Sequence, residues 1–182
     1  TATFVASTVN AMKDAGIGSV LKHFPGYGNN VDTHTGIAVD ERSFETLSLD
    51  FLPFEAGISV GADQLGRQTT SVLVSHNIIT CLDAELPASL SPEVHRLLRE
   101  SLLFDGVVMT DDLAMDAVAA YSEDGAVAVM SIQAGNDLVL TSDYRTQIPK
   151  VLESVENGTL SMDTIDTACR RVLTWKQALG LI

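Results

Sequence analysis

The sequence is poor in basic and in aromatic residues. Eleven Lys and Arg stand against 24 Asp and Glu, which gives a formal net charge of −13 over 182 residues, and aromatic residues make up 5%. A nucleic-acid-binding protein needs a basic face that neutralises phosphates, and binders of single strands also use aromatic stacking platforms. An anionic membrane surface repels the same negative charge. The composition therefore argues against nucleic acid and against a membrane surface as partners.

Cysteines and long apolar runs are also scarce. Cys81 and Cys169 lie far apart and neither belongs to a CxxC pair, so a zinc site built on thiolates is not expected, and both are predicted to be buried free thiols. No run approaches the roughly 18 apolar residues that a membrane span needs. The chain begins with Thr1 and shows no signal peptide, so it assigns no compartment.

Apolar runs alternate with helical patterns along the chain. Four short aliphatic runs have the composition of buried parallel strands: 19–22, 72–75, 107–110 and 138–141. Helices are predicted over 3–14, 44–60, from the cap at Ser91 onward, 118–134, 145–157 and after the cap at Ser161, while 61–70 is predicted as a surface loop. This alternation predicts an α/β fold with a parallel sheet. A complete eight-unit barrel usually needs about 250 residues, so four or five units form either an open sheet or part of a barrel.

Polar residues follow each predicted strand, at the end of the sheet where α/β folds bind ligands. After the first strand comes the segment KHFPGYG, 22–28. Its proline and glycines predict a tight turn that leaves the backbone open to a ligand, with Lys22 and His23 as donors to a polar group. The alternative is an ordinary strand end, with Lys22 in solvent and His23 bonded to backbone.

Two further groups of residues could carry acid–base chemistry. Asp32 lies two residues before His34, where a carboxylate can orient an imidazole and stabilise its protonated form; the alternative is an exposed pair on a loop. Asp111 and Asp112 end a buried strand. Neighbouring residues at a strand end point in opposite directions, so one carboxylate can face a pocket and attack an anomeric carbon; the alternative is that both cap the next helix.

Two histidines receive different interpretations. His76, at the end of the second predicted strand, is expected to line the same pocket, while His95 is interpreted as a surface or packing residue. A hard-cation site at Asp111, Asp112 and Asp116 is disfavoured, and no cluster has metal-ligand spacing such as HExxH. No metal and no cofactor are expected.

Taken together, the motifs resemble those of glycoside hydrolase family 3, and within it the β-N-acetylhexosaminidases of peptidoglycan recycling. The resemblance rests on the order and spacing of KHFPGYG at 22–28, DTH at 32–34 and VVMTDDLAM at 107–115. Further agreement comes from LPF at 52–54, VSH at 74–76, GND at 135–137 and RRVL at 170–173. It implies that residues 1–182 form a partial catalytic domain, the C-terminal half of a (β/α)8 TIM-type barrel whose N-terminal half is absent.

The resemblance also implies a reaction. Asp111 would be the nucleophile of a retaining hydrolase that removes terminal β-N-acetylglucosamine, and His34, partnered by Asp32, would be the general acid/base. Lys22 and His23 would bind the sugar, and His76 is placed with them as a substrate ligand. Two alternatives stay open: a glycoside phosphorylase that uses the same site, and a sugar-binding module without catalysis. β-Glucosidase and β-xylosidase activities fit less well, because those relatives lack the DTH pattern.

The sequence departs from the family pattern in two ways. Tyr27 stands where the family usually has histidine, which puts a contact behind the site in doubt. The half of the barrel that supplies further sugar-binding Asp and Arg residues has no counterpart here. The chain alone is therefore expected to have little activity and to cover its strand edges by self-association or by pairing with a partner half. Relatives occur in the cytoplasm and at the cell wall, so the location stays open.

Overall fold

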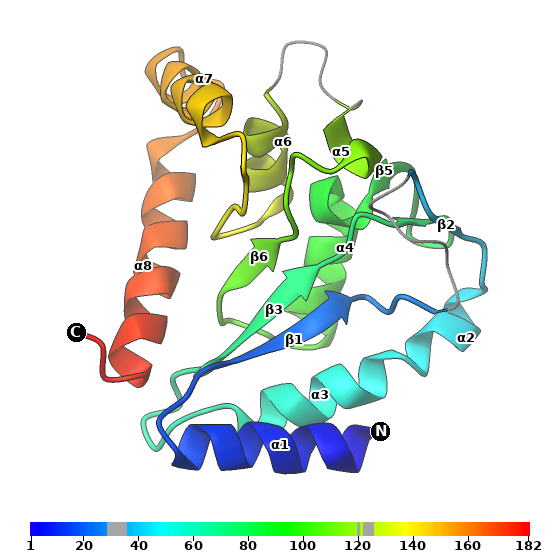
Figure 1. Cartoon of the computed structure of the whole chain (residues 1–182), viewed down its shortest axis with the longest axis vertical. Helices are drawn as coiled ribbons and strands as arrows, with labels where there is room; N and C mark the ends of the chain where they lie inside the picture. The colour runs from blue at the N-terminus through cyan, green and yellow to red at the C-terminus, as the bar shows by residue number, and fades with distance from the viewer. Residues whose placement is uncertain (29–35, 120, 122–125) are drawn as a thin grey trace.

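The computed structural model describes residues 1–28, 36–119, 121 and 126–182. Its main sheet has three parallel strands in the order β1-β3-β6, namely Ser19–Phe24, Thr70–Val74 and Val108–Thr110 (Figure 1). A fourth segment joins through a single parallel bridge between Met109 and Leu138. The Thr110 hydroxyl, in place of a backbone carbonyl, accepts the Leu140 amide at 3.0 Å, which limits this fourth strand to one bridge. The predicted parallel α/β arrangement is confirmed.

The helices and the remaining strands follow the alternation expected from the sequence. They are α1 Ala2–Asp14, β2 Val39–Asp40, α2 Phe44–Ser48, α3 Phe51–Val60, β4 Ile78–Ile79, β5 Asp83–Pro87, a 3-10 turn Ala88–Leu90, α4 Pro92–Arg96, a π-helical turn Leu97–Ser101, α5 Asp116–Ala119, α6 Val127–Ala134, α7 Tyr144–Glu156 and α8 Met162–Ala178. The side chains of Ser43, Ser91 and Ser161 each cap a helix by accepting an amide. In the described part of the chain, no helix has both the length and the apolar character of a membrane span.

The helix predicted over 44–60 is two helices. Pro53 cannot donate a hydrogen bond to the carbonyl of Leu49 and its ring crowds that position, so α2 ends at Ser48 and α3 begins at Phe51. The sequence does not predict the small second sheet, in the order β2-β4-β5, because β2 and β4 have two residues each and such short strands carry no readable periodicity. Its pairing of Val39 with Ile78 ties the chain that follows segment 29–35 to the loop after β3.

The main core lies between the sheet and the helices α1, α3 and α4. Phe24 and Phe54 meet edge to face at 5.2 Å among buried aliphatic side chains. The helices α1 and α3 run side by side (Figure 1). Gly57 permits the close approach of α3 to β1, since a Cβ there would lie 2.8 Å from Leu21. This packing holds the carboxyl end of β1 in a fixed position.

A second contact surface joins α8 to the other face of the sheet. Val172 and Trp175 pack against Leu73 and Met109, and the indole of Trp175 donates to the carbonyl of Thr69 at 3.0 Å. Buried Asp137 binds both Arg99 and Arg171, at 2.7 and 2.9 Å. These contacts fix the amino ends of the strands, opposite the candidate site.

Two expectations about packing were wrong. Both cysteines are exposed, Cys81 in the turn after β4 and Cys169 on the solvent side of α8. The spacing of Met162, Ile165, Cys169, Val172 and Leu173 predicts an apolar face on α8, but Met162, Cys169 and Leu173 are exposed. The partly buried row is instead Ile165, Ala168, Val172, Trp175 and Leu179. Both rows have helical spacing. The observed row is the one that contains Trp175, whose large ring packs against the sheet.

Candidate active site

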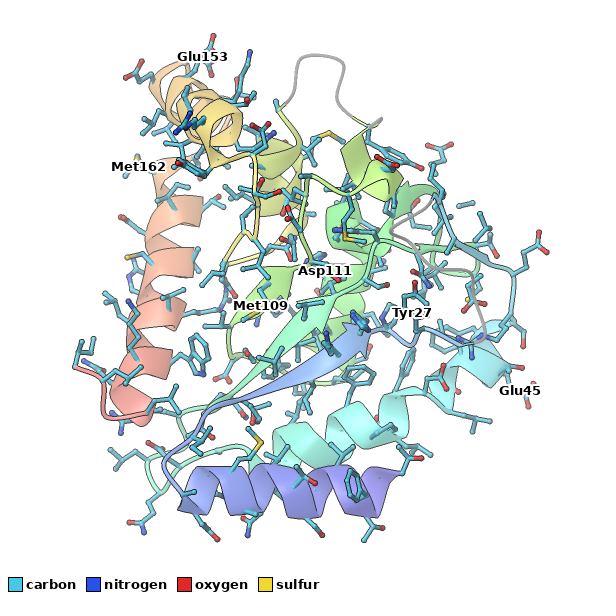
Figure 2. The ribbon with its side chains drawn as sticks, viewed as in Figure 1. Tyr27, Glu45, Met109, Asp111, Glu153 and Met162 are labelled. Carbon is cyan, nitrogen blue, oxygen red and sulfur yellow. The ribbon has the colours of Figure 1, made fainter. Side chains whose placement is uncertain are left out.

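The carboxyl ends of β1 and β6 bring two of the predicted motifs together. Nε2 of His23, in β1, lies 3.7 Å from Oδ2 of Asp111, which directly follows β6. Both side chains are about a third exposed, at 29% and 30%. Figure 2 shows Asp111 and Tyr27 at this end of the sheet. An accessible carboxylate with a histidine beside it is therefore present where α/β folds bind ligands.

The two neighbouring aspartates have different surroundings. Oδ1 of Asp112 accepts the amides of Ala114 and Ser142, each at 2.9 Å, and so joins the loop after β6 to the loop before α7. Burial opposes ionisation of Asp112, but these hydrogen bonds outweigh it and hold its pKa below the usual value. Among the described residues, the adjacent Asp112 amide is what Oδ1 of Asp111 accepts, at 3.0 Å, while Oδ2 faces His23. Asp111 is thus the carboxylate of the pair that is open to a ligand.

His76 lies beneath the site and not on its surface. It is 1% exposed, its Nε2 lies 3.1 Å from the carbonyl of Asp112 and its Nδ1 lies 2.7 Å from Oγ of Ser89. A carbonyl can only accept, so Nε2 carries the proton and Nδ1 accepts from Ser89. Burial lowers the pKa of His76 and favours this neutral ring. Both nitrogens are engaged, so the expectation that His76 lines the pocket is corrected: β3 lies between β1 and β6, and its end is covered from both sides.

A tight turn follows β1, as its sequence predicts. Gly26 has a φ of +138° and a Cβ there would lie 2.4 Å from Oδ2 of Asp50. Gly28 has a φ of +58° and packs on the guanidinium of Arg42. The peptide bonds Lys22–His23 and Phe24–Pro25 are cis. The turn therefore rests on the charged side chains of Arg42 and Asp50, and glycine avoids a close contact and backbone strain at these two positions.

Arg42 is the centre of an ion-pair network that the motifs did not indicate. Its Nε and Nη2 bind the carboxylate of Asp40, with Nη2 2.6 Å from Oδ2, and its Nη1 lies 2.8 Å from Oδ2 of Asp50. The hydrogen bonds that Arg42 donates to Asp40 raise the pKa of Arg42 above its usual value. The three charged residues at 40–42 indicate that a local ion pair can form, but nothing in the sequence shows that the Arg42 side chain reaches Asp50.

A cavity of about 880 Å³ opens beside this turn. Its lining includes Lys22, His23, Tyr27 and Arg42. The rings of His23 and Tyr27 lie 5.5 Å apart, tilted by 54°. Lys22 is exposed at its edge, while His23 joins the cavity to Asp111. Hydrogen-bond donors, an aromatic ring and a carboxylate thus converge at one end of the sheet, as a carbohydrate site requires.

The expected acid/base pair cannot be placed in this geometry. Asp32 and His34 fall in 29–35, outside the described residues. Gly28, which directly precedes this segment, and Asp40, five residues after its end, both line the cavity. In the described ranges, no three His, Cys, Asp or Glu side chains form a group that could hold a metal ion.

Comparison with known proteins identifies the family. The model of the glycosyl hydrolase family 3 N-terminal domain matches residues 1–175. The chain belongs to glycoside hydrolase family 3. This confirms the resemblance drawn from the three motifs. The arrangement of parallel strands and helices is that of the TIM-barrel-like domain of family 3 structures, which confirms the expected fold class.

The family 3 chain is similar to several named proteins. A β-hexosaminidase of Stenotrophomonas maltophilia (strain K279a) is 35% identical over 184 residues, which cover 98% of this chain and 50% of that protein. A β-hexosaminidase of Psychromonas ingrahamii is 35% identical over 158 residues, 86% of this chain and 45% of the relative. A family 3 β-N-acetylglucosaminidase structure from Paenibacillus sp. str. FPU-7 has a TM-score of 0.87 at 32% identity and covers 97% of this chain and 34% of that one. The chain spans about half the length of the curated relatives it matches.

Proposed function

We propose that the full-length protein containing this chain is a retaining glycoside hydrolase that removes terminal β-N-acetylglucosamine, with Asp111 as its nucleophile. The observation that carries the proposal is the placement of Asp111: Oδ2 lies 3.7 Å from His23 and takes no part in the caps that occupy Asp112. Membership of family 3 and similarity to proteins named β-hexosaminidase support the substrate.

In the first step, the Asp111 carboxylate attacks C1 of the sugar. A bond forms between its oxygen and C1 while the bond from C1 to the glycosidic oxygen breaks, and His34 gives a proton to that leaving oxygen. Lys22 and His23, at the carboxyl end of β1, donate hydrogen bonds to the sugar hydroxyls. His76 serves the step indirectly, since its Nε2–H holds the Asp112 carbonyl next to the nucleophile.

In the second step, water replaces the enzyme at C1. His34, now neutral, takes a proton from the water, whose oxygen bonds to C1 as the bond to Asp111 breaks. Two inversions at C1 leave the β configuration unchanged. A histidine has an ordinary pKa near 6.5, which allows both proton transfers at neutral pH, and Asp32 is proposed to orient its ring. No metal or other cofactor takes part in this scheme.

The substrates proposed are carbohydrates that end in β-N-acetylglucosamine, and peptidoglycan fragments are one such class. We also propose that the 182-residue chain alone turns over little substrate. β1 is an edge strand of the main sheet and its Val20 is 45% exposed, which leaves one side of the site uncovered. Robust turnover by the isolated chain would contradict this part of the proposal.

The decisive experiment traps the covalent intermediate. The full-length protein is incubated with a fluorinated N-acetylglucosaminyl substrate that is attacked quickly and hydrolysed slowly, and the labelled peptide is identified by mass spectrometry. The label is expected on Asp111, and a label on Asp112 or on no residue would refute the assignment. Turnover that requires inorganic phosphate would indicate a phosphorylase, and sugar binding without turnover would indicate a binding module.

A further inference from the structure

A run of hydrogen bonds reaches the proposed nucleophile from beneath the site. Oγ of Ser89 lies 2.7 Å from Nδ1 of His76, and Nε2 of His76 lies 3.1 Å from the carbonyl oxygen of Asp112. The Asp112 amide in turn donates to Oδ1 of Asp111 at 3.0 Å. Because the carbonyl can only accept, Nε2 carries the proton and the Ser89 hydroxyl donates to Nδ1. Every hydrogen bond of the run is therefore donated in the direction of Asp111.

Ser89 is itself held firmly at its backbone. It lies in the 3-10 turn that follows β5 and is 0% exposed. Its amide donates to the carbonyl of Ser75 at 2.9 Å, and its carbonyl accepts Nδ2 of buried Asn136 at 2.8 Å. These two bonds tie Ser89 to the end of β3 and to the loop after α6. The hydroxyl thus meets His76 from a fixed position.

The run does not depend on the open edge of the sheet. It lies at the end of β3, which has β1 on one side and β6 on the other. Each of its hydrogen bonds joins two described residues, and the rings and hydroxyls that carry it are buried within this chain. The geometry around His76 is therefore set by this chain itself.

We propose that Ser89 is a positioning residue for the nucleophile: its hydroxyl fixes the His76 ring, and the ring fixes the main chain of Asp112, whose amide orients the Asp111 carboxylate. The inference rests on the proposed function and adds a residue to its machinery. With one hydrogen bond at each ring nitrogen, His76 is held from two sides, whereas the Asp112 contact alone would leave the ring free to turn. A carboxylate that must approach C1 along one line loses rate when its orientation spreads.

Single substitutions in the full-length protein test the kinetic consequence. Ser89→Ala is expected to lower kcat by about threefold to tenfold and to leave KM within about twofold, because Ser89 is too deeply buried to touch a ligand. Ser89→Cys keeps a weak donor of similar size and is expected to lose less than Ser89→Ala. An unchanged kcat in Ser89→Ala, or a loss confined to KM, would overturn the inference.

Ser131→Ala is the matched control. Ser131, in α6, is also 0% exposed, and its carbonyl also accepts Nδ2 of Asn136 at 2.8 Å. Its hydroxyl has no hydrogen-bond partner among the described residues, and it makes no recorded contact with His76. The kcat of Ser131→Ala is expected to stay within about twofold of the unmodified protein. Equal losses in the Ser89 and Ser131 variants would show that any buried cavity near Asn136 slows the enzyme, and would overturn the inference.

A double-mutant cycle shows whether Ser89 acts through His76. His76→Phe keeps a ring of similar size and removes both nitrogens. In that background Ser89→Ala is expected to cause almost no further loss of kcat, because the contact through which it acts is already gone. The same fold loss in both backgrounds would mean that Ser89 acts by another route and would overturn the inference.

Nitrogen-15 spectra of the histidine rings read the contact without any turnover. In the unmodified protein His76 is expected to carry its proton on Nε2 and to accept a hydrogen bond at Nδ1. Ser89→Ala is expected to shift the Nδ1 signal, and Ser131→Ala is expected to leave it in place. A proton on Nδ1 in the unmodified protein, or an unchanged Nδ1 signal in Ser89→Ala, would overturn the inference.

The outcomes separate this inference from the proposed function. If the unmodified full-length protein cleaves no β-N-acetylglucosaminide, the proposed hydrolase activity fails, and the role of Ser89 in it fails too. If the protein is active and Ser89→Ala keeps its full kcat, the activity stands and the positioning role of Ser89 is wrong. A lower kcat together with a shifted Nδ1 signal supports both.

Discussion

Nε2 of His23 and Oδ2 of Asp111 lie 3.7 Å apart, although β1 and β6 are separated by the whole width of β3. The two side chains meet because each comes at the carboxyl end of its strand and leans over the buried end of β3. A separation of 3.7 Å is longer than a hydrogen bond, so Oδ2 stays accessible to an electrophile while a donor stands next to it. The arrangement suits a carboxylate that must bond to carbon.

The contrast between Asp111 and Asp112 gives the first prediction. Asp111→Asn in the full-length protein is expected to lower kcat by at least about a thousandfold, because an amide is a poor nucleophile. Asp112→Asn keeps an oxygen that can accept the Ala114 and Ser142 amides, so its kcat is expected to fall by less than about tenfold. Steady-state kinetics on an aryl β-N-acetylglucosaminide measure both, and equal losses would contradict the division of roles.

Chemical rescue sharpens the same prediction. In Asp111→Ala, a small anion such as azide can occupy the space of the lost carboxylate and attack C1. The expected product is the α-glycosyl azide, because a single inversion occurs. Azide is not expected to rescue Asp112→Ala, because that variant keeps the proposed nucleophile and loses only the hydrogen bonds that Asp112 accepts from two loop amides. Formation of the β-azide from Asp111→Ala would exclude Asp111 as the group that attacks C1.

The second prediction concerns the proposed acid at position 34. His34→Ala is expected to slow substrates with poor leaving groups by about a hundredfold or more, because the departing oxygen is then not protonated. A dinitrophenyl glycoside, whose leaving group needs little protonation, is expected to keep most of its rate for bond cleavage. The measurement is the first-step rate across a series of aryl leaving groups. A uniform loss across the series would argue against an acid role for His34.

The third prediction tests how the β1 turn is held. Gly26→Ala places a Cβ 2.4 Å from Asp50 in a backbone conformation that alanine avoids, so the turn must shift. The expected result is a loss of about 1–3 kcal/mol in unfolding free energy together with a higher KM, since Lys22 and His23 precede the turn. Gly66→Ala is the control: its φ is also positive, at +78°, but nothing lies within 4 Å. A loss in Gly66→Ala as large as in Gly26→Ala would show that backbone strain alone, and not the contact with Asp50, is responsible.

Sequence patterns predicted the elements of this fold better than their contacts. Aliphatic runs and serine caps placed the strands and most helices, because both signals are local. The division of 44–60 was missed although Pro53 was visible, since a proline early in a helix can equally well be tolerated. The correct face of α8 depends on Trp175 reaching the carbonyl of Thr69, a contact between distant parts of the chain.

In the candidate site, too, the sequence predicts some residues and misses the contacts between distant parts of the chain. Asp111, His23 and Lys22 follow from strand ends and from the motif resemblance, and the structure brings the first two together. The binding of Arg42 to both Asp40 and Asp50 could not be predicted, because it depends on how α3 packs beside the β1 turn. The sequence predicts that His76 lines the pocket, but its side chain is buried. The burial results from β1 and β6 on either side of β3, and the sequence does not show that these strands are neighbours.

The last prediction uses the two buried histidines. Burial lowers the pKa of both His76 and His95 below the ordinary value of 6.5. Below about pH 6.5 the unfolded chain therefore binds more protons than the folded one, and the free energy of unfolding falls as pH falls. Their contribution is fully present above about pH 6.5 and is lost as pH drops through the folded pKa values. The lowered pKa of Asp112 acts in a separate window, near its ordinary value of 3.8 and below.

Urea unfolding between pH 7.5 and pH 5.5 isolates the histidine effect. Two histidines can add at most about 2.7 kcal/mol per pH unit, because each proton contributes about 1.4 kcal/mol. His95→Gln is expected to weaken the slope by about half, since Nδ1–H of His95 donates to the Ser91 carbonyl and a glutamine amide can replace that donor without titrating. An unchanged slope in His95→Gln would mean that His95 stays neutral in both states over this range. A stability that rises on acidification would contradict the buried neutral state of both rings, and with it the tautomer that holds the Asp112 carbonyl beside Asp111.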